Sequence, residues 1–272
     1  MASLGVNYFS RFGLEYDPFV KNSKDVFIDN TETREVLKRL DYLKESNGFG
    51  LLTGDPGLGK TSCIRKWSNS LNRSRYKVVY SCMSTLTVKE FYSHLCYGFG
   101  LEPSYYKSQN FRKIQDEITR LVMDKRITPI LIIDEANHIS NGILTDLKMI
   151  FNFEMDSKDR AIVLLSGQSQ INNTLSMNSF ESIKQRIVMN YNMEGLNKID
   201  GRDYIIKKLE SAGCTSAVFE EPAIEAILNS AEGKPRVINK LCTTAMMIAD
   251  MKSESMVSSE IAMSAFNENQ LG

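Results

Sequence analysis

A glycine-rich segment of the sequence has the residue types and the spacing that are needed to hold phosphate groups. It fits the pattern GxxxxGK followed by Ser or Thr, in which small residues let backbone N–H groups converge on phosphate oxygens. Lys60 is expected to reach the β- and γ-phosphates of ATP, and the hydroxyl of Thr61 is expected to hold Mg2+. The predicted nucleotide-binding residues of this segment are Gly54, Asp55, Pro56, Gly57, Leu58, Gly59, Lys60, Thr61 and Ser62.

A second candidate group, Asp134-Glu135, closes the apolar run 129–134. Asp134 is expected to bind Mg2+ through water, and Glu135 is expected to polarise the attacking water as a general base. A base directly after the metal-binding aspartate indicates hydrolysis rather than phosphoryl transfer to a small acceptor. Two solvated acids at the end of a strand are the structural alternative.

Four further polar residues follow along the chain as candidate nucleotide sensors. Ser166 and Gln168 end another apolar run, where a polar side chain can contact the γ-phosphate. Arg186 precedes the last expected strand and is interpreted as a catalytic arginine finger that reaches into a neighbouring subunit. Arg236 opens a late helix and is expected to bend back onto the phosphates. Each of these residues also fits an ordinary strand exit or surface position.

The segment 197–200 reads Asn-Lys-Ile-Asp and matches the guanine-recognition box of GTPases. Two features argue against that role. The residues after Asp134 lack the glycine of the GTPase switch, and the segment runs directly into a helical pattern for which Asn197 or Asp200 is a good cap. We therefore expect adenine rather than guanine nucleotides.

Apolar runs and helical periodicity alternate up to residue 195, and only helical patterns follow. Strands are expected at 49–53, 77–82, 129–134, 161–166 and 187–193. Helices are expected at 31–45, with Thr31 as N-cap, and at 62–71, 88–99, 111–125, 144–153, 203–212, 222–231, 235–252 and 258–267. This order predicts a doubly wound α/β fold with a parallel sheet, followed by a small C-terminal helical lid.

Three regions are expected from this pattern. Residues 1–30 form an aromatic N-terminal segment that packs on the ATPase core, residues 31–195 form the P-loop α/β domain, and residues 196–272 form the lid and tail. Lys+Arg and Asp+Glu both number 33, so the net charge is zero. Zero net charge does not indicate DNA binding, but it leaves it open because charge can gather on one face.

The cysteine and histidine content argues against a structural metal site. The five cysteines include no CxxC pair and the chain has two histidines, so no zinc site is expected. No window approaches the roughly 18 apolar residues needed to span a bilayer. We expect a soluble protein of the bacterial cytoplasm that does not contact membranes.

Taken together, the motifs resemble those of AAA+ ATPases, and more narrowly those of the ExeA/TnsC-like group. Phe12-Gly13-Leu14 with Pro18-Phe19 is similar to the opening signature of that group. The P-loop, Asp134-Glu135, the Ser166–Gln168 segment, Gln185-Arg186 and Gly233–Arg236 then follow in the order of the group. The resemblance covers about residues 8 to 250. It implies the AAA+ P-loop fold, ATP and Mg2+.

The group divides by function. Some members are secretion-pathway ATPases that continue into a membrane anchor, whereas relatives such as TnsC, IstB and MuB assist transposition. Because this sequence stops at Gly272 without an anchor, we expect the second role. The resemblance then implies a homo-oligomer, a ring or a helical filament, that assembles on double-stranded DNA with ATP. It also implies recruitment or activation of a transposase, with a target-selection protein as a further partner, and hydrolysis that controls disassembly. Alternatives are an ExeA-type ATPase acting on protein partners and a nucleotide-dependent signalling switch.

Two basic stretches are candidates for DNA contact. Residues 105–113 separate two expected helices, where related ATPases place a DNA-contacting insertion. The cations of that stretch can bind phosphates, and a second patch lies near residue 75; a solvated loop fits the same residues. The candidate DNA contacts are Lys107, Arg112, Lys113, Arg73 and Arg75.

Overall fold

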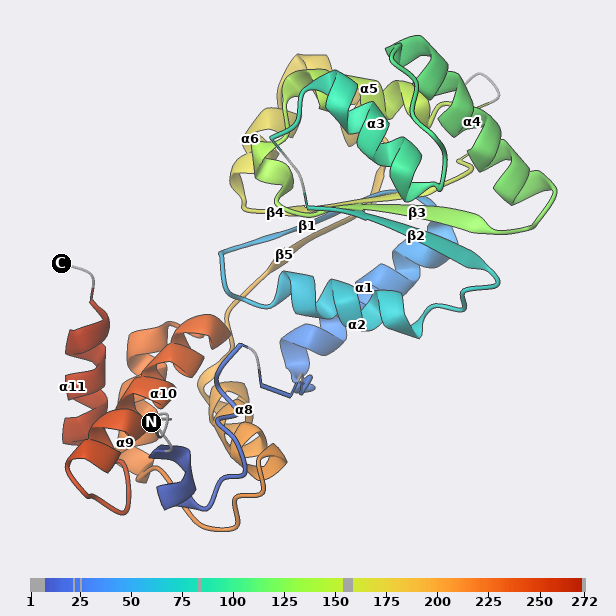
Figure 1. The fold of residues 1–272 in the computed structure, drawn as a ribbon. Helices are drawn as coiled ribbons and strands as arrows, with labels where there is room; N and C mark the ends of the chain where they lie inside the picture. Colours follow the sequence, from blue (N-terminus) through green and yellow to red (C-terminus); the bar gives the residue numbers. More distant parts are fainter. Residues whose placement is uncertain (1–7, 22, 25, 83–84, 154–158, 271–272) are drawn as a thin grey trace. The chain divides into compact units, whose positions relative to one another are not determined.

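The structure is a computed structural model that describes residues 8–21, 23–24, 26–82, 85–153 and 159–270 (Figure 1). It divides into two compact units. The α/β unit comprises Glu35–Pro56 and Lys60–Met193, and the helical unit comprises Met1–Arg34, Gly57–Gly59 and Glu194–Gly272.

The α/β unit is built on a five-stranded sheet in the order β2-β3-β4-β1-β5, and every pairing is parallel. The expected doubly wound parallel sheet is therefore confirmed. Each strand forms at an apolar run of the sequence. Strands β1, β3 and β4 are almost wholly buried because helices cover both faces of the sheet. The strands are β1 (Gly48–Gly54), β2 (Tyr76–Ser81), β3 (Thr128–Ile133), β4 (Ile162–Gly167) and β5 (Ile187–Met193).

Helices lie on both faces of this sheet. In Figure 1, α1 and α2 cover one face, whereas α3, α4, α5 and α6 cover the other. The main helices are α1 (Thr31–Ser46), α2 (Lys60–Ser70), α3 (Val88–Gly98), α4 (Lys107–Met123) and α5 (Asn141–Ile150). Shorter turns are η2 (Ala136–His138), α6 (Gln170–Leu175), η4 (Asn178–Phe180) and α7 (Glu181–Lys184).

Helices α2, α4, α5 and α8 begin two to five residues before their expected starts, and the cap of α1 also differs from the expectation. Asn30, not Thr31, caps α1, because its Oδ1 accepts a hydrogen bond from the Thr33 N–H at 2.9 Å. Helix α4 begins four residues before the expected Phe111. Its first turn is fixed by Asn110, whose side chain is fully buried and bonds both the N–H and the C=O of Ser104, at 2.6 and 2.9 Å. The stretch 107–113 is thus helical rather than an insertion loop.

The helical unit joins the N-terminal segment to the C-terminal helices. Its elements are η1 (Tyr8–Phe12), α8 (Lys198–Ser211), α9 (Glu221–Ala231), α10 (Pro235–Met251) and α11 (Ser259–Asn269). Tyr8, Phe12 and Phe19 are buried in one apolar cluster with side chains of α8, α9, α10 and α11.

The aromatic side chains of the N-terminal segment complete the core of the helical unit. Polar bonds fix them there: the Tyr16 hydroxyl donates to the Ser211 carbonyl at 2.7 Å, and Lys208 Nζ donates to the Pro18 carbonyl at 3.1 Å. Sequence distance hid this partnership, because the two halves of the core are about 190 residues apart in the chain. The expected packing of this segment on the α/β core stays a prediction.

Candidate active site

Several chemically active side chains meet at the carboxyl end of the parallel sheet. Strand β1 leads into the P-loop, and Asp134 follows β3 directly. Because all five strands run in the same direction, these residues lie together at the carboxyl end of the sheet, where α/β proteins place their ligands.

Lys60 opens helix α2 and is 9% exposed. Its ammonium group donates to the carbonyls of Gly54 at 2.7 Å and Asp55 at 2.9 Å, so it lies folded over the P-loop backbone. The first N–H groups of α2 are at the same place, and the N-terminus of a helix favours anions. A phosphate bound here gains both from the ammonium group and from the helix.

The tip of the P-loop has a backbone that side chains rarely allow. Gly57 and Gly59 have φ of +86° and +108°, which residues with a Cβ adopt at a cost. Residues Gly57–Gly59 belong to the helical unit, where the Arg236 N–H donates to the Gly57 carbonyl at 3.2 Å. The side chain of Arg236 is exposed. Its contact with phosphate stays a prediction.

Asp134 is the best connected carboxylate of the site and is 4% exposed. Its Oδ2 accepts from the Thr61 hydroxyl at 2.7 Å and from the Tyr80 hydroxyl at 3.0 Å, while its Oδ1 accepts from the Glu135 N–H at 3.1 Å. The Thr61 hydroxyl and the Asp134 carboxylate, expected from sequence to share one metal ion, are thus in direct contact. Tyr80 was not anticipated, because its place on β2 carries no motif. Burial and the Asp134 carboxylate raise the pKa of this phenol.

Glu135 is exposed and adopts a left-handed backbone conformation, with φ +53° and ψ +38°. A residue with a Cβ is uncommon in this region and costs conformational energy, a feature that clusters at functional sites. Because of this turn, the side chains of the adjacent acids Asp134 and Glu135 point in different directions. Asp134 is turned into the hydrogen-bond network, while the Glu135 carboxylate is left accessible to water.

Two serine hydroxyls lie buried at the ends of the two strands that flank β3. The Oγ atoms of Ser81, at the end of β2, and Ser166, near the end of β4, have no hydrogen-bond partner among the described residues. Nearby, the Gln168 N–H donates to Asn137 Oδ1 at 3.0 Å, and this bond joins the exit of β4 to η2. A buried hydroxyl without a partner is costly unless a ligand or water completes it. The role of Ser166 as a sensor stays a prediction, and Asn137 supports the segment that follows Ser166.

The residues present fit Mg2+. The Thr61 hydroxyl and the Asp134 carboxylate are hard oxygen donors, which this ion prefers. Mg2+ in nucleotide sites is held by one or two protein groups together with phosphate oxygens and waters. No group of three or more His, Cys, Asp or Glu side chains able to hold a metal occurs in the described part of the chain.

Comparisons with known proteins place this geometry in a fold family. Residues 43–175 match the family model described as an AAA domain. Cdc6p from Pyrobaculum aerophilum has a similar crystal structure, with a TM-score of 0.71 at 14% identity over 94% of this chain and 71% of that one. The chain has the AAA+ P-loop fold. The Aeropyrum pernix ORC1 protein, solved in complex with DNA, shares the fold with a TM-score of 0.64 at 18% identity, over 92% of this chain and 68% of that one.

A curated relative matches almost the whole chain in sequence. General secretion pathway protein A of Aeromonas hydrophila is 29% identical over 267 residues, which is 95% of this chain but 48% of that protein. The chain thus spans about half the length of this relative. No helix among the described residues is long and apolar enough to cross a membrane.

Within this AAA+ fold, Arg186 lies at the opposite end of the sheet from the P-loop. Its carbonyl accepts from the N–H of Phe49, at the start of the seven-residue strand β1. The two ends of such a strand are about 20 Å apart. The guanidinium donates to the carbonyls of Lys148 and Phe151 at 3.4 Å each, at the end of α5, and burial lowers its pKa. Arg186 cannot reach the P-loop of its own chain, so its predicted catalytic role requires a second copy.

The candidate DNA contacts fall into two places. On α4, Lys107 Nζ forms an ion pair with the buried Asp146 at 2.6 Å, and Lys113 Nζ donates to the Glu102 carbonyl at 2.8 Å. Lys107 is thus paired with a buried charge, and Lys107, Arg112 and Lys113 are all exposed. Arg73 and Arg75 are exposed before β2, at the amino end of the sheet. The structure does not bring the two groups together.

The guanine-box match is accounted for by helix capping. The Asn197 side chain accepts from the Asp200 N–H at 2.8 Å and donates to the Asp200 carboxylate at 2.9 Å, so both residues close the first turn of α8. The cap expected from the sequence is thus Asn197. None of the five cysteines, all within the described residues, forms a disulfide.

Proposed function

We propose that this chain is an ATPase whose hydrolysis is completed by a neighbouring copy. The observation that supports this most directly is the 2.7 Å hydrogen bond between the Thr61 hydroxyl and the Asp134 carboxylate, beside Lys60 and Glu135. Phosphate-binding, metal-binding and base groups from two distant segments meet there at the carboxyl end of the sheet.

Each residue has a separate task in the proposed reaction. Lys60 and the N-terminus of α2 bind the phosphates, and the P-loop backbone orients them. Thr61 and Asp134 would hold Mg2+, which, when bound, neutralises charge on the β- and γ-phosphates. Glu135 takes a proton from a water molecule whose oxygen attacks the γ-phosphorus, the bond from that phosphorus to the β–γ bridging oxygen breaks, and ADP leaves. Arg186 of a second copy stabilises the charge of the transition state.

Replacing the base without removing its shape tests this assignment. Glu135→Gln should lower turnover by about a hundredfold or more, because the amide cannot accept the proton. ATP should still bind and should accumulate in the assembled protein. Glu102→Gln, an exposed glutamate distant from the site, is the matched control and should keep wild-type turnover. Unchanged turnover in Glu135→Gln contradicts the role of the base and favours a non-hydrolysing nucleotide switch.

We further propose that ATP drives assembly of the chain on double-stranded DNA, in service of a transposase. The similarity of the motifs to the ExeA/TnsC-like group supports this, as does the exposed Arg112 on α4. A chain without net charge gains DNA affinity by repeating a few cations along a polymer of subunits, since each phosphate contact adds a salt-dependent contribution.

Salt-dependent DNA binding with and without ATP tests the proposal. Binding to duplex DNA should require ATP, fall steeply with salt and coincide with oligomers in sedimentation. Arg112→Ala should weaken binding to all DNA sequences alike and reduce the salt dependence. If ATP induces neither an oligomer nor DNA binding, the DNA proposal fails while the ATPase proposal stands.

A second candidate is an ATPase that acts on protein partners of a secretion pathway. The 29% identity to General secretion pathway protein A over 95% of this chain supports it. It predicts ATP turnover that duplex DNA leaves unchanged. Stimulation of turnover by DNA argues against it.

A further inference from the structure

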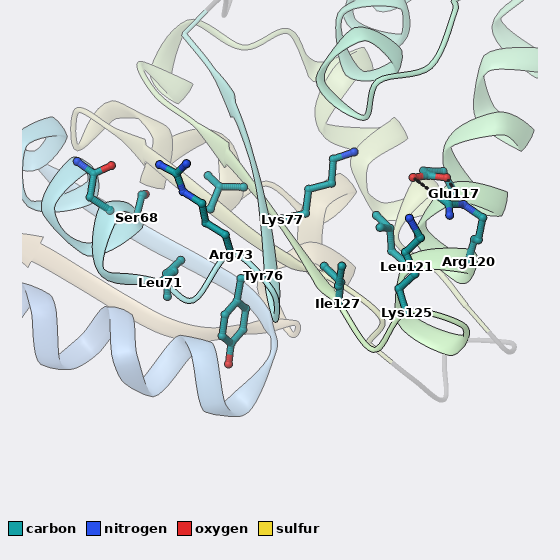
Figure 2. A pocket seen from close by; sticks show the side chains of 12 residues that line it. Ser68, Leu71, Arg73, Tyr76, Lys77, Glu117, Arg120, Leu121, Lys125 and Ile127 are labelled. Carbon is teal, nitrogen blue, oxygen red and sulfur yellow. Dashed lines mark hydrogen bonds and ion pairs between the residues drawn. The ribbon is translucent and has the colours of Figure 1, made fainter.

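A groove of about 570 Å³ lies beside the edge strand β2, in the α/β unit. Residues from the end of α2 line it on one side and residues of α4 on the other, with Tyr76, Lys77 and Val78 of β2 between them. Figure 2 shows this arrangement, with Ser68 and Leu71 on the α2 side and Glu117, Arg120 and Leu121 on the α4 side. Since α2 and α4 cover opposite faces of the sheet (Figure 1), the groove lies where a sixth strand would extend it.

The backbone of β2 offers hydrogen bonds on this side. Strand β2 has β3 as its one neighbour in the sheet. The carbonyls of Arg75 and Ser81 accept from N–H groups at the two ends of β3, at 2.8 Å each. Backbone groups alternate in direction along a strand, so the N–H and C=O groups of Val78 and Tyr80 point away from β3. Val78 lines the groove and forms no backbone hydrogen bond to a described residue on that side.

The charge of the groove is positive. Arg73, Lys77, Arg120 and Lys125 line it together with one acid, Glu117. That acid is already paired, because Arg120 donates two hydrogen bonds of 2.7 Å to it. In Figure 2, Arg73 stands at one end and Lys125 at the other, with Lys77 between them. Burial lowers the pKa of the Lys77 ammonium, so a nearby carboxylate would stabilise its charged form.

Further features favour a peptide over a simple anion. Leu71, Leu121 and Ile127 supply apolar lining, and the Ser68 hydroxyl is buried without a hydrogen-bond partner among the described residues. Apolar lining, one unused hydroxyl, an open strand edge and flanking cations together match a chain that has a backbone and alternating side chains.

We propose that this groove binds an extended acidic segment of a partner protein, which adds to the sheet as a parallel or antiparallel strand beside β2. The backbone of the segment bonds to Val78 and Tyr80, and its carboxylates meet Arg73 and Lys125. Strand addition of this kind takes affinity from main-chain hydrogen bonds and specificity from the side chains on either face. The surface stands apart from the carboxyl end of the sheet and does not depend on the proposed ATPase reaction.

The cations of the groove have two alternative roles, which experiment separates from peptide binding. Duplex DNA can bind the same charges through phosphates, but it leaves the backbone of Val78 without a partner. Cations can also protect an edge strand from unwanted pairing, in which case no segment binds.

A labelled peptide that alternates threonine or valine with glutamate is a direct probe for the full-length protein. Fluorescence anisotropy should show binding that a counterpart with lysine in place of glutamate does not share. Arg73→Glu with Lys125→Glu should weaken it by about tenfold or more. The same reversal at Arg65 and Lys66, exposed cations on α2 that do not line the groove, is the control and should leave affinity within about twofold.

Amide hydrogen exchange separates the occupants. Peptide binding should slow exchange at the Val78 and Tyr80 amides, and a peptide with N-methyl groups on its pairing face should neither bind nor protect them. Equal binding of the glutamate and lysine peptides overturns the proposal, as does binding without protection at Val78. DNA binding that is lost in Arg73→Glu with Lys125→Glu, while peptide binding is absent, assigns the groove to nucleic acid instead.

Discussion

At the carboxyl end of the sheet, polar side chains from distant segments bond to one another, whereas at the amino end two cationic side chains, those of Arg186 and Lys77, bond to backbone carbonyls. The hydroxyls of Thr61 on α2 and Tyr80 on β2 both donate to one carboxylate oxygen of Asp134, which follows β3. Arg186, in contrast, donates to carbonyls at the end of α5, and Lys77 Nζ donates to the Phe99 carbonyl at 2.6 Å.

The side chains at the two ends of the sheet differ in where the groups that neutralise their charge come from. The carboxyl end contains Asp134 and the proposed base Glu135, so the proposed reaction needs a nucleotide and Mg2+ from outside. The groove beside β2 is lined by four cations and one acid, and we propose that it meets an acidic segment, as we propose that Arg186 meets a neighbouring copy. Substitutions at either end of the sheet test this division.

Removing the P-loop ammonium should have the largest effect on nucleotide binding. Lys60→Ala deletes a buried charge that is expected to contact two phosphates, so ATP affinity should fall by roughly two orders of magnitude. Isothermal titration with ATP and Mg2+ measures this. Lys66→Ala, on the exposed side of the same helix, should bind ATP as the wild type does.

Arg186→Ala should leave ATP affinity of the isolated chain nearly intact while it lowers turnover by about three orders of magnitude. A mixing experiment separates this role from a purely structural one. Neither Arg186→Ala nor Glu135→Gln should turn over alone, but their mixture should regain activity, because some sites then combine Glu135 of one copy with Arg186 of the other. Absence of rescue, or loss of ATP binding in Arg186→Ala, contradicts the division between the two ends.

Tyr80→Phe should have a smaller effect at the carboxyl end. It removes one hydrogen bond to the Asp134 carboxylate and keeps the ring, so turnover at limiting Mg2+ should fall roughly threefold to tenfold. The defect should shrink at high Mg2+ if the hydroxyl positions the carboxylate for the ion. Tyr97→Phe, an exposed tyrosine of α3, is the control. A defect in turnover of equal size at every Mg2+ concentration would show that the Tyr80 hydroxyl does not act through Mg2+ binding.

The smallest effect is expected from the paired acid of the groove. Hydrogen bonds from Arg120 hold the pKa of Glu117 below its ordinary value. The pair therefore contributes its full stabilisation above the ordinary pKa and loses it as the pH falls through the lowered pKa. Arg120→Gln should lower the thermal midpoint slightly at neutral pH, and the difference should vanish in acid. A difference that grows in acid would have the wrong sign.

Elements with a strong local signal were predicted well from the sequence. The bounds of β5 agree at both ends, and β3 follows the apolar run 129–134 closely. The P-loop and Asp134-Glu135 could be found because phosphate and metal binding demand particular residues at fixed spacing along one segment.

What sequence reasoning missed depends on contacts between distant residues. Nothing near Tyr80 indicates that its hydroxyl meets Asp134, 54 positions later. The early start of α4 rests on the burial of Asn110, which no local propensity records. The N-terminal aromatic side chains have a clear need for burial, but the sequence does not say that helices α8 to α11 supply it.

The core of the helical unit combines residues that precede the α/β unit in the sequence with residues that follow it. The helical unit can therefore fold only after the whole α/β unit has been synthesised. The ribosome delivers Tyr8, Phe12 and Phe19 first, and their packing partners emerge only after β5 has been made. The α/β unit can fold meanwhile, as domains generally fold as units during synthesis. The aromatic segment of the nascent chain therefore lacks its packing partners until helices α8 to α11 have been made.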